Sequence, residues 1–350
     1  GYKEDIEAAL RTEGFGGFHL LGLTDFPGQG TALVGVLNPF WESKGYCTPE
    51  EFARFCGPTV PLARLPRRVW TADQEIRFEV QVAHFGPTPL VADVRWHLRD
   101  RGGKELASGD VARGAHIPIG NGARFGPVVV PAGLVPEPAQ VTLAVSVGDA
   151  AGVSSENDWD LWVYPAAEEV APPDGILVTA EIDDALDRAG DGATVLLELG
   201  PERIGNDVAL GFTPAFWNTA WTSGQAPHTL GVLHDPAHPV FRHFPTEGST
   251  DWQWWELLHG AKAMLLDGLP PGLRPLAQPI DTWFEARRLG VLFEAKVGRG
   301  RIVVSSLNLD PSGDRAAARQ FRKSLLDYMG SADFAPAETL APTDLMSVLR

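Results

Sequence analysis

The chain has 350 residues, of which 44% are hydrophobic and 21% are charged, a balance typical of a globular protein with room for two or three domains. Its net charge of −16 repels phosphate backbones and anionic lipids, so we expect neither nucleic acid nor a membrane surface as a partner. No apolar run approaches the length that spans a bilayer.

The first element predicted is a helix over residues 3–10, and no basic and apolar leader precedes it. We therefore expect Gly1 to be a cut point in a longer protein. The expected localisation depends on the upstream part. It is periplasmic or extracellular if that part carries a signal peptide, and otherwise cytoplasmic.

The segment 1–61 continues with a glycine-rich entry and the apolar run Phe18–Leu23, which predicts a short buried strand. A polar loop follows at residues 24–31 and an apolar stretch at residues 32–37. One strand, one loop and a few helical turns cannot enclose a core. We therefore expect this segment to bury its apolar side chains against another domain or another chain.

Helix signals are specific near the end of this segment. Thr48 stands where an N-cap is needed, Pro49 suits the first helical position, and Glu51 can complete a capping box. The two cysteines, Cys47 and Cys56, lie at opposite ends of this short helix, too far apart for a disulfide. Two free thiols are predicted.

Residues 62–165 contain short runs of strand type separated by turns. Polar and apolar residues alternate with period two at residues 77–83 and 93–99, and strand-like runs recur as far as residue 165. About seven strands in roughly a hundred residues predict an immunoglobulin-like β-sandwich. Trp96 and Trp162 fall at alternating positions and are interpreted as core residues more than as ligand-binding ones.

After the linker 166–173 the pattern changes to a strand at residues 176–178, a helix at 182–189 and a strand at 194–199. A strand–helix–strand unit predicts a parallel sheet. We expect a flavodoxin-like, class I amidotransferase-like α/β domain over residues 174–331, closed by an amphipathic helix, and an irregular tail over residues 332–350.

This α/β domain carries no complete catalytic constellation. In amidotransferase-like folds a Cys nucleophile occupies a sharp turn after a strand, but the comparable turn, residues 196–202, contains neither Cys nor Ser. Gly298–Arg301 resembles a tight hairpin more than a phosphate loop. His234, Asp235 and His238 could be metal ligands, yet the prolines beside them favour a loop. We expect no catalysis, metal or cofactor here.

Tryptophan is frequent, with 11 residues against 4 Tyr, and indole rings stack on sugars as well as filling cores. Trp252, Trp254 and Trp255 cannot all face one core. Either a sugar-stacking platform or a contact with another domain or subunit explains them. We favour the contact, because a single domain rarely devotes three indoles to one sugar ring.

Asp25 and Glu42 are the candidate active-site acids of the chain. Retaining glycosidases need two carboxylates about 5–5.5 Å apart, and loops that follow barrel strands present such groups to the sugar. Asp25 could instead be a turn residue before Phe26. One acid on such a segment does not make a mechanism.

Three stretches, Gly16–Phe26, Asp25–Leu37 and Phe40–Tyr46, carry a family resemblance. The glycine-rich entry, apolar strand and Asp-Phe loop resemble the last barrel strand of glycoside hydrolase family 2, which contains β-galactosidases and β-glucuronidases. The order of domains in those bacterial enzymes is also similar. Residues 235–245 resemble the amidotransferase-like modules of some β-galactosidases and trehalose-utilisation-type proteins.

The resemblance implies a multidomain α+β chain that joins the end of a (β/α)8 barrel, an immunoglobulin-like sandwich and a flavodoxin-like domain. It places both catalytic glutamates on earlier barrel strands, so the catalytic residues are unknown in this chain, which alone should be inactive. The parent would hydrolyse O-glycosidic bonds by double displacement. The substrate-binding residues implied are Asp25, Phe26, Gln29, Trp41 and Glu42.

A second class of function stays open beside the hydrolase. The chain could be a carbohydrate-binding or oligomer-assembly module without hydrolase activity, in which the α/β domain builds an interface. The expected partners are therefore a carbohydrate, a further copy of the chain in a homo-oligomer, or the remainder of the barrel.

Overall fold

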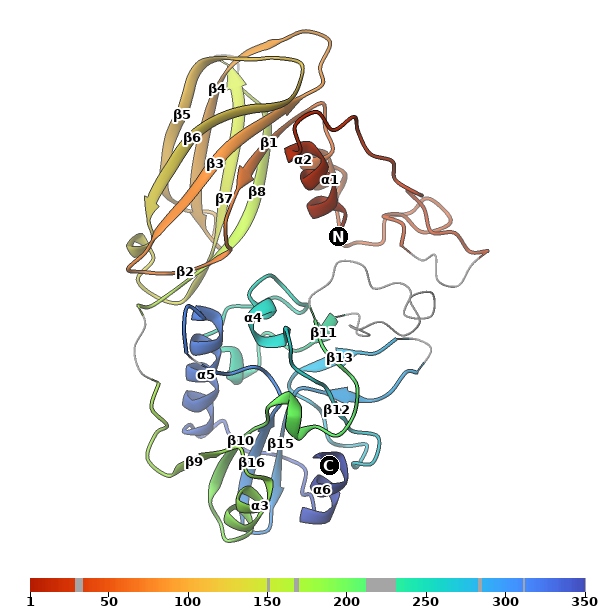
Figure 1. Cartoon of the computed structure of the whole chain (residues 1–350), viewed down its shortest axis with the longest axis vertical. Coiled ribbons are helices and arrows are strands. Elements are labelled where there is room, and N and C mark those ends of the chain that lie inside the picture. The colour runs from red at the N-terminus through yellow and green to blue at the C-terminus, as the bar shows by residue number, and fades with distance from the viewer. Residues whose placement is uncertain are drawn as a thin grey trace. The chain divides into compact units, whose positions relative to one another are not determined.

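The computed structural model describes residues 1–28, 34–149, 152–166, 170–211, 231–282, 285–310 and 312–349. They form two compact units, Gly1–Leu134 with Gln140–Val163, and Val135–Ala139 with Tyr164–Arg350 (Figure 1). The multidomain organisation expected from the sequence is thus confirmed at this level, and the described chain is rich in β-strands. None of the helices in the described ranges is long and apolar enough to cross a membrane.

Two sheets form a β-sandwich in the first unit (Figure 1). One sheet has the strand order β1-β3-β6, and the other has the order β2-β8-β7-β4-β5. The strands are β1 (Thr59–Arg64), β2 (Val69–Thr71), β3 (Glu75–His84), β4 (Leu90–Asp100), β5 (Glu105–Ile117), β6 (Gly120–Pro131), β7 (Ala139–Asp149) and β8 (Gly152–Tyr164), with a 3-10 turn, η1 (Ala132–Leu134), after β6.

The predicted period-two alternation fills the core of this sandwich. In β4 every second side chain from Ala92 to Leu98 is buried. Phe78 of β3 meets Trp96 of β4 edge to face, with ring centroids 6.3 Å apart, and so joins the two sheets. Trp162 is 1% exposed. The core roles predicted for Trp96 and Trp162 are confirmed.

Strand β5 is not predicted from the sequence, because its 13 residues are rich in glycine and polar side chains. It lies at the edge of the five-stranded sheet, where one side needs no strand partner. Gly109 of β5 pairs with Trp96 of β4. A side chain at Gly109 would meet the Trp96 indole, so this glycine leaves room for the ring.

Two helices of the first unit form where the sequence predicts them, α1 (Tyr2–Arg11) and α2 (Pro49–Phe55). The Thr48 hydroxyl accepts from the Glu51 amide at 3.2 Å, and the Glu51 carboxylate accepts from the Thr48 amide at 2.7 Å. This is the predicted capping box. Cys47 and Cys56 are free thiols, as predicted.

The buried strand predicted at Phe18–Leu23 is wrong for the described chain. These residues are irregular, and Phe18, Leu21 and Leu23 are 38%, 92% and 41% exposed. A buried strand needs hydrogen-bonded neighbours. Among the described residues, the only strand-type pairing next to this stretch is the isolated bridge between Thr24 and Leu37.

A four-stranded sheet with the order β15-β16-β10-β9 forms the centre of the second unit. Strands β9, β10 and β16 are parallel, and β15 is antiparallel to β16. Two small sheets pair β11 with β13 and β12 with β14. The elements are β9 (Ile176–Thr179), α3 (Ile182–Gly190), β10 (Thr194–Glu198), η2 (Pro201–Arg203), β11 (Gly231–Leu233), η3 (Pro239–Phe241), α4 (Trp254–Leu258), β12 (Met264–Leu265), β13 (Gln278–Ile280), β14 (Leu289–Gly290), β15 (Leu292–Val297), β16 (Gly300–Ser305), α5 (Ala316–Met329) and α6 (Pro342–Leu349).

Helices lie on both faces of the central sheet (Figure 1). Helix α3 shares a core with Val195 and Leu197 of β10 and with Leu345 of α6. Helix α5 contacts the other face, where Arg322 donates to Glu198 at 2.9 Å. The predicted strand–helix–strand unit, closing helix and hairpin at Gly298 are all present.

The tail predicted as irregular is wrong in part, because α6 occupies Pro342–Leu349. Leu345 is completely buried and Val348 is 8% exposed, three residues further along. This spacing places both side chains on one helix face, and a proline suits the first turn. The proline and the spacing of Leu345 and Val348 therefore indicate a helix, although the composition of the tail suggests a loop.

Candidate functional site

Asp25 anchors the loop that the sequence singles out. It is 7% exposed, and its Oδ1 accepts from the Gly35 amide at 2.8 Å and from Lys44 Nζ at 3.0 Å. The Asp25 amide donates to the carbonyl oxygen of Leu37 at 2.9 Å. Asp25 therefore ties the stretch before it to residues 34–46. We call residues 22–28 and 34–46 the Asp25 loop.

Close backbone approach explains the glycine at position 35. A Cβ atom at Gly35 would overlap the backbone of Thr24 and Asp25. Two tyrosine hydroxyls donate to neighbouring carbonyl oxygens, Tyr2 to Val34 at 2.8 Å and Tyr46 to Gly35 at 2.9 Å. One phenol from α1 and one from the end of the loop itself thus hold the backbone at residues 34 and 35.

The pKa values of both phenols follow from this placement. Burial and the nearby Asp25 carboxylate raise the pKa of Tyr2. Burial also raises the pKa of Tyr46, with smaller effects from Tyr2, Cys47 and Asp25. Both phenols thus stay protonated at neutral pH and act as hydrogen-bond donors to the loop.

A turn organised by Asn38 presents two aromatic rings. Asn38 Oδ1 accepts from the Phe40 amide at 2.9 Å and from the Glu42 amide at 3.0 Å, and its Nδ2 donates to Glu42 Oε2 at 2.8 Å. Trp41 takes a left-handed φ of 67°, and the residue is 69% exposed. Phe40 is 81% exposed. Such strain at an exposed aromatic residue is typical of binding loops.

The candidate residues fall into two groups. Phe26, Trp41 and Glu42 lie on the surface of the loop, whereas Asp25 is buried beneath it and paired with Lys44. Gln29 lies outside the described residues. Asn38, Lys44 and Tyr46 were not predicted as site residues, although the pair Asn38-Pro39 is a recognisable turn signal. Exposed aromatic rings on such a turn can stack on a ligand. Asp25, paired with Lys44, and Glu42, hydrogen-bonded to Asn38, hold the loop in place.

A second polar cluster lies inside the second unit. His234 Nε2 lies 3.1 Å from the Thr246 hydroxyl, which donates to Asp251 Oδ2 at 3.2 Å and accepts from Trp254 Nε1 at 3.0 Å. All but Asp251 are less than 9% exposed. We call these four residues the Thr246 cluster. Burial raises the pKa of Asp251 to about 7 and lowers the pKa of His234.

The three adjacent tryptophans divide between core and surface. Trp254 is completely buried among Phe241, Phe244 and Phe321, whereas Trp252 and Trp255 are 40% and 46% exposed. Trp255 stacks on His259 with ring centroids 4.9 Å apart. The expectation that Trp254 belongs to an aromatic contact surface is wrong, because its ring completes the domain core.

The His234 stretch forms the loop that its prolines predict, with His238 as the N-cap of η3. Over the described ranges, no group of three His, Cys, Asp or Glu side chains could hold a metal ion. At the start of α5, Glu256 Oε2 accepts from the amides of Ala317 and Ala318 at 3.0 and 3.2 Å. A side chain of the chain itself therefore fills the place where a helix amino end would bind an anion.

Two family models match the chain. Residues 177–350 match a domain of unknown function (DUF8487), and residues 74–165 match another (DUF8488). These ranges correspond to most of the α/β unit and of the sandwich. A comparison with curated proteins finds no match.

Solved structures similar to parts of the chain include glycosidases. A Parabacteroides merdae β-glucuronidase is 12% identical with a TM-score of 0.24, over 40% of this chain and 21% of its own. A Listeria innocua β-glucosidase is 11% identical with a TM-score of 0.22, over 31% and 16%. The CARDB domain of a Pyrococcus furiosus protein is 11% identical with a TM-score of 0.22, over 31% and 92%. The chain thus corresponds to a small share of either glycosidase.

Proposed function

We propose that the chain is the carboxy-terminal part of a glycoside hydrolase of the family 2 type. In this proposal, residues 1–61 complete a catalytic (β/α)8 barrel, the sandwich is immunoglobulin-like and the α/β unit is an inactive amidotransferase-like domain. The supporting sequence evidence is the resemblance at residues 16–46. The observation that supports the proposal most is the Asp25 loop, in which a turn held by Asn38 exposes Phe40 and Trp41 to solvent.

The role proposed for this loop is to bind sugar rather than to break the glycosidic bond. Exposed indole and phenyl faces stack on the apolar faces of sugar rings. The acids of the loop are already engaged, Asp25 with Lys44 and Glu42 with Asn38. The two catalytic carboxylates of a double displacement would come from other barrel strands.

The apolar side chains of Phe18, Leu21 and Leu23 support the barrel part of the proposal. Burying each would contribute roughly 1.5–3 kcal/mol, so their exposure favours a partner surface. The remainder of the barrel is the proposed partner, because its apolar residues would cover these exposed side chains.

Sugar titration of two tryptophan variants tests the proposal. Trp41→Ala should abolish the fluorescence change caused by an oligosaccharide, whereas Trp255→Ala, a matched exposed indole of the other unit, should keep it. Loss of binding in Trp255→Ala alone would assign the sugar to the α/β unit. That result would favour the second candidate function, a carbohydrate-binding module, for which the half-exposed Trp252 and Trp255 are the specific observation.

Binding that persists in both variants would contradict the role proposed for the Asp25 loop. The panel should contain galactosides, glucuronides and glucosides, because the sequence does not distinguish among these sugars. Thermal unfolding of each variant provides the control, since both indoles lie on the surface and neither change should alter the midpoint by more than a few degrees.

A further inference from the structure

Helix α1 connects the Asp25 loop to the sandwich. At its amino end the Tyr2 hydroxyl donates to the carbonyl oxygen of Val34 in the loop at 2.8 Å. At its carboxyl end the carbonyl oxygen of Arg11 accepts from Arg64 of β1 at 2.5 Å and from Gln81 of β3 at 3.3 Å. The loop and the sandwich are therefore in hydrogen-bonded contact with the same ten-residue helix.

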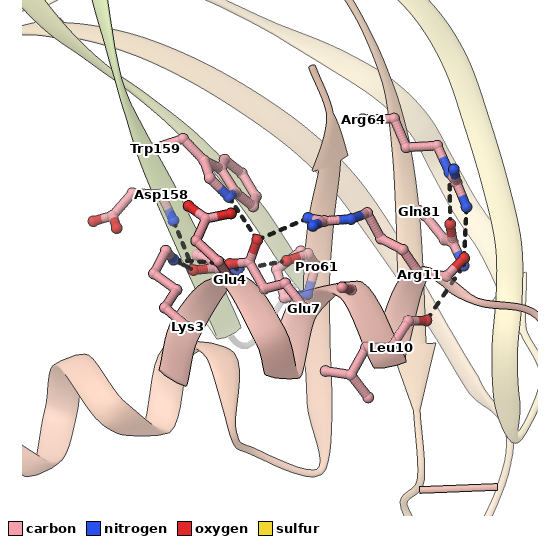
Figure 2. Close-up of polar contacts among 12 residues, drawn as sticks. Lys3, Glu4, Glu7, Leu10, Arg11, Pro61, Arg64, Gln81, Asp158 and Trp159 are labelled. Carbon is pink, nitrogen blue, oxygen red and sulfur yellow. Dashed lines mark hydrogen bonds and ion pairs between the residues drawn. The ribbon is translucent and has the colours of Figure 1, made fainter. Parts of the chain in front are cut away.

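Glu7 fixes the middle of α1 to strand β8 (Figure 2). Its carboxylate is completely buried and accepts from the side chains of Asn157 at 2.8 Å and Trp159 at 2.9 Å. Lys3 and Arg11, one turn before and after it on the helix, each lie 2.9 Å from its oxygens. Every partner of this carboxylate is thus a donor.

The surroundings of Glu7 favour its charged form. Burial alone would raise the pKa of Glu7, but Lys3 and the hydrogen bonds from Trp159 and Asn157 outweigh it and hold the pKa below its usual value. The ammonium group of Lys3 also lies over the rings of Trp159 and Phe55, at 5.3 and 5.5 Å from the centroids. Removing the charge would leave these donors buried without an acceptor of equal strength.

Apolar and surface contacts also hold α1, whose Ile6 is 3% exposed. Leu10 packs on the small apolar cluster of Val60, Leu62 and Ala83, and Glu4 pairs with Arg68 at 3.1 Å. An apolar contact fixes a helix against a sheet but sets its rotation and axial position less sharply than directional bonds. Glu7 in the middle of α1 and the Arg11 carbonyl at its end therefore make the directional contacts that set where Tyr2 lies.

We propose that Glu7 is a positioning residue of the Asp25 loop, acting through α1 and Tyr2. The sandwich would then influence the geometry of the aromatic turn at Phe40 and Trp41. Three hydrogen bonds make the connection: Trp159 to Glu7, Tyr2 to Val34, and Gly35 to Asp25. The ligand role of the loop is that of the proposed function, on which this inference rests.

Amide exchange of the full chain tests the connection without any ligand. Glu7→Gln should speed exchange of the Gly35 and Leu37 amides by about tenfold or more, because losing one charged acceptor costs at least about 1.4 kcal/mol. Tyr2→Phe should speed the same two amides while the α1 amides keep their wild-type rates. Glu50→Gln, the same change at an exposed position of α2, should leave all of them unaltered.

The exchange result and the binding result are separable. If Glu7→Gln loosens α1 but the Gly35 and Leu37 amides keep their wild-type rates, the positioning role is overturned. If Tyr2→Phe leaves the loop unchanged, the path through Tyr2 is overturned as well. Absence of sugar binding by the unmodified chain would contradict the proposed function alone. Where sugar binds, Glu7→Gln should weaken it by a factor similar to its effect on loop exchange.

Discussion

The Thr246 hydroxyl lies 3.0 Å from the indole Nε1 of Trp254 and 3.1 Å from Nε2 of His234. The hydroxyl also lies 3.2 Å from Asp251 Oδ2 and 3.3 Å from the carbonyl oxygen of Glu247, and it accepts from the Trp254 indole N–H, which can only donate. One hydroxyl therefore lies within hydrogen-bonding distance of three side chains, those of His234, Asp251 and Trp254.

Replacing this hydroxyl should destabilise the second unit. Thr246→Val keeps the shape but leaves the Trp254 indole N–H without its acceptor and His234 Nε2 without its hydroxyl partner, at a cost of about 1–3 kcal/mol for each buried group. Urea unfolding should show the loss as a lower midpoint with an unchanged slope. The control is Thr343→Val, the same substitution on the exposed face of α6. Equal midpoints for the two variants would contradict the assigned network.

The stability of this unit should fall as the pH rises toward neutrality. The folded-state pKa of Asp251 is about 7, above its usual value near 3.9, so the folded state binds the proton more tightly. Its stabilising contribution is complete below about pH 4 and is lost as the pH rises to about 7.

The variant Asp251→Asn should lack this pH dependence. The difference in unfolding free energy between wild type and variant should decline between pH 4 and 7, by up to about 1.4 kcal/mol per pH unit. His234, whose pKa is lowered, contributes with the opposite sign, but it is present in both proteins. Asp187→Asn, on the exposed face of α3, is the control. Parallel curves for wild type and Asp251→Asn would refute the prediction.

A methyl group should not be tolerated at the start of β16. A Cβ at Gly300 would overlap the carbonyl oxygens of Ala189 and Ala193, whereas one at Gly190 would meet nothing within 4 Å. We expect Gly300→Ala to cost about 1–3 kcal/mol, as overpacking does, and Gly190→Ala to be neutral or slightly stabilising. Thermal unfolding of the two variants measures the contrast, and similar midpoints would show that the hairpin moves aside easily.

The purified chain should not turn over aryl glycosides, because a double displacement needs both catalytic carboxylates. A panel of nitrophenyl sugars at micromolar protein concentration measures this. Turnover that Asp25→Asn abolishes, with Asp187→Asn fully active, would show that the chain carries its own catalytic machinery.

The exposed apolar stretch should cause self-association of the isolated chain. Leu21 is 92% exposed and lies beside two further large apolar residues, Phe18 and Leu23, so copies can shield one another. Light scattering should detect species larger than the monomer, and Leu21→Ser should reduce them. A strictly monomeric wild-type chain would contradict this expectation.

Local periodicity predicted the parts of the fold whose partners are near in sequence. The βαβ unit and the capped helix at Pro49 follow from spacing and end signals alone. Strand β5 was missed because an edge strand tolerates glycine and polar residues. The stretch Phe18–Leu23 has strand composition, but composition does not supply the neighbouring strands that a buried strand needs.

The sequence predicted which residues form the candidate site better than it predicted how they are arranged. An Asp before an aromatic residue suggested a ligand-facing acid, but the carboxylate lies beneath the loop because Gly35 and Lys44 reach it from positions 10 and 19 residues away. The close spacing of Trp252, Trp254 and Trp255 indicated that they could not all be buried in one core. Which of them is buried depends on Phe241, Phe244 and Phe321, and only the tertiary structure brings those rings together.

The contact between Glu256 and the amino end of α5 has a thermodynamic consequence for any soluble anion. The carboxylate is tethered beside the amides of Ala317 and Ala318, so its effective concentration there is millimolar or higher. A free phosphate would have to displace the Glu256 carboxylate from these amides. The displacement would also leave the half-buried Glu256 without its hydrogen-bond donors. The amino end of α5 is therefore already occupied by a carboxylate of the chain itself.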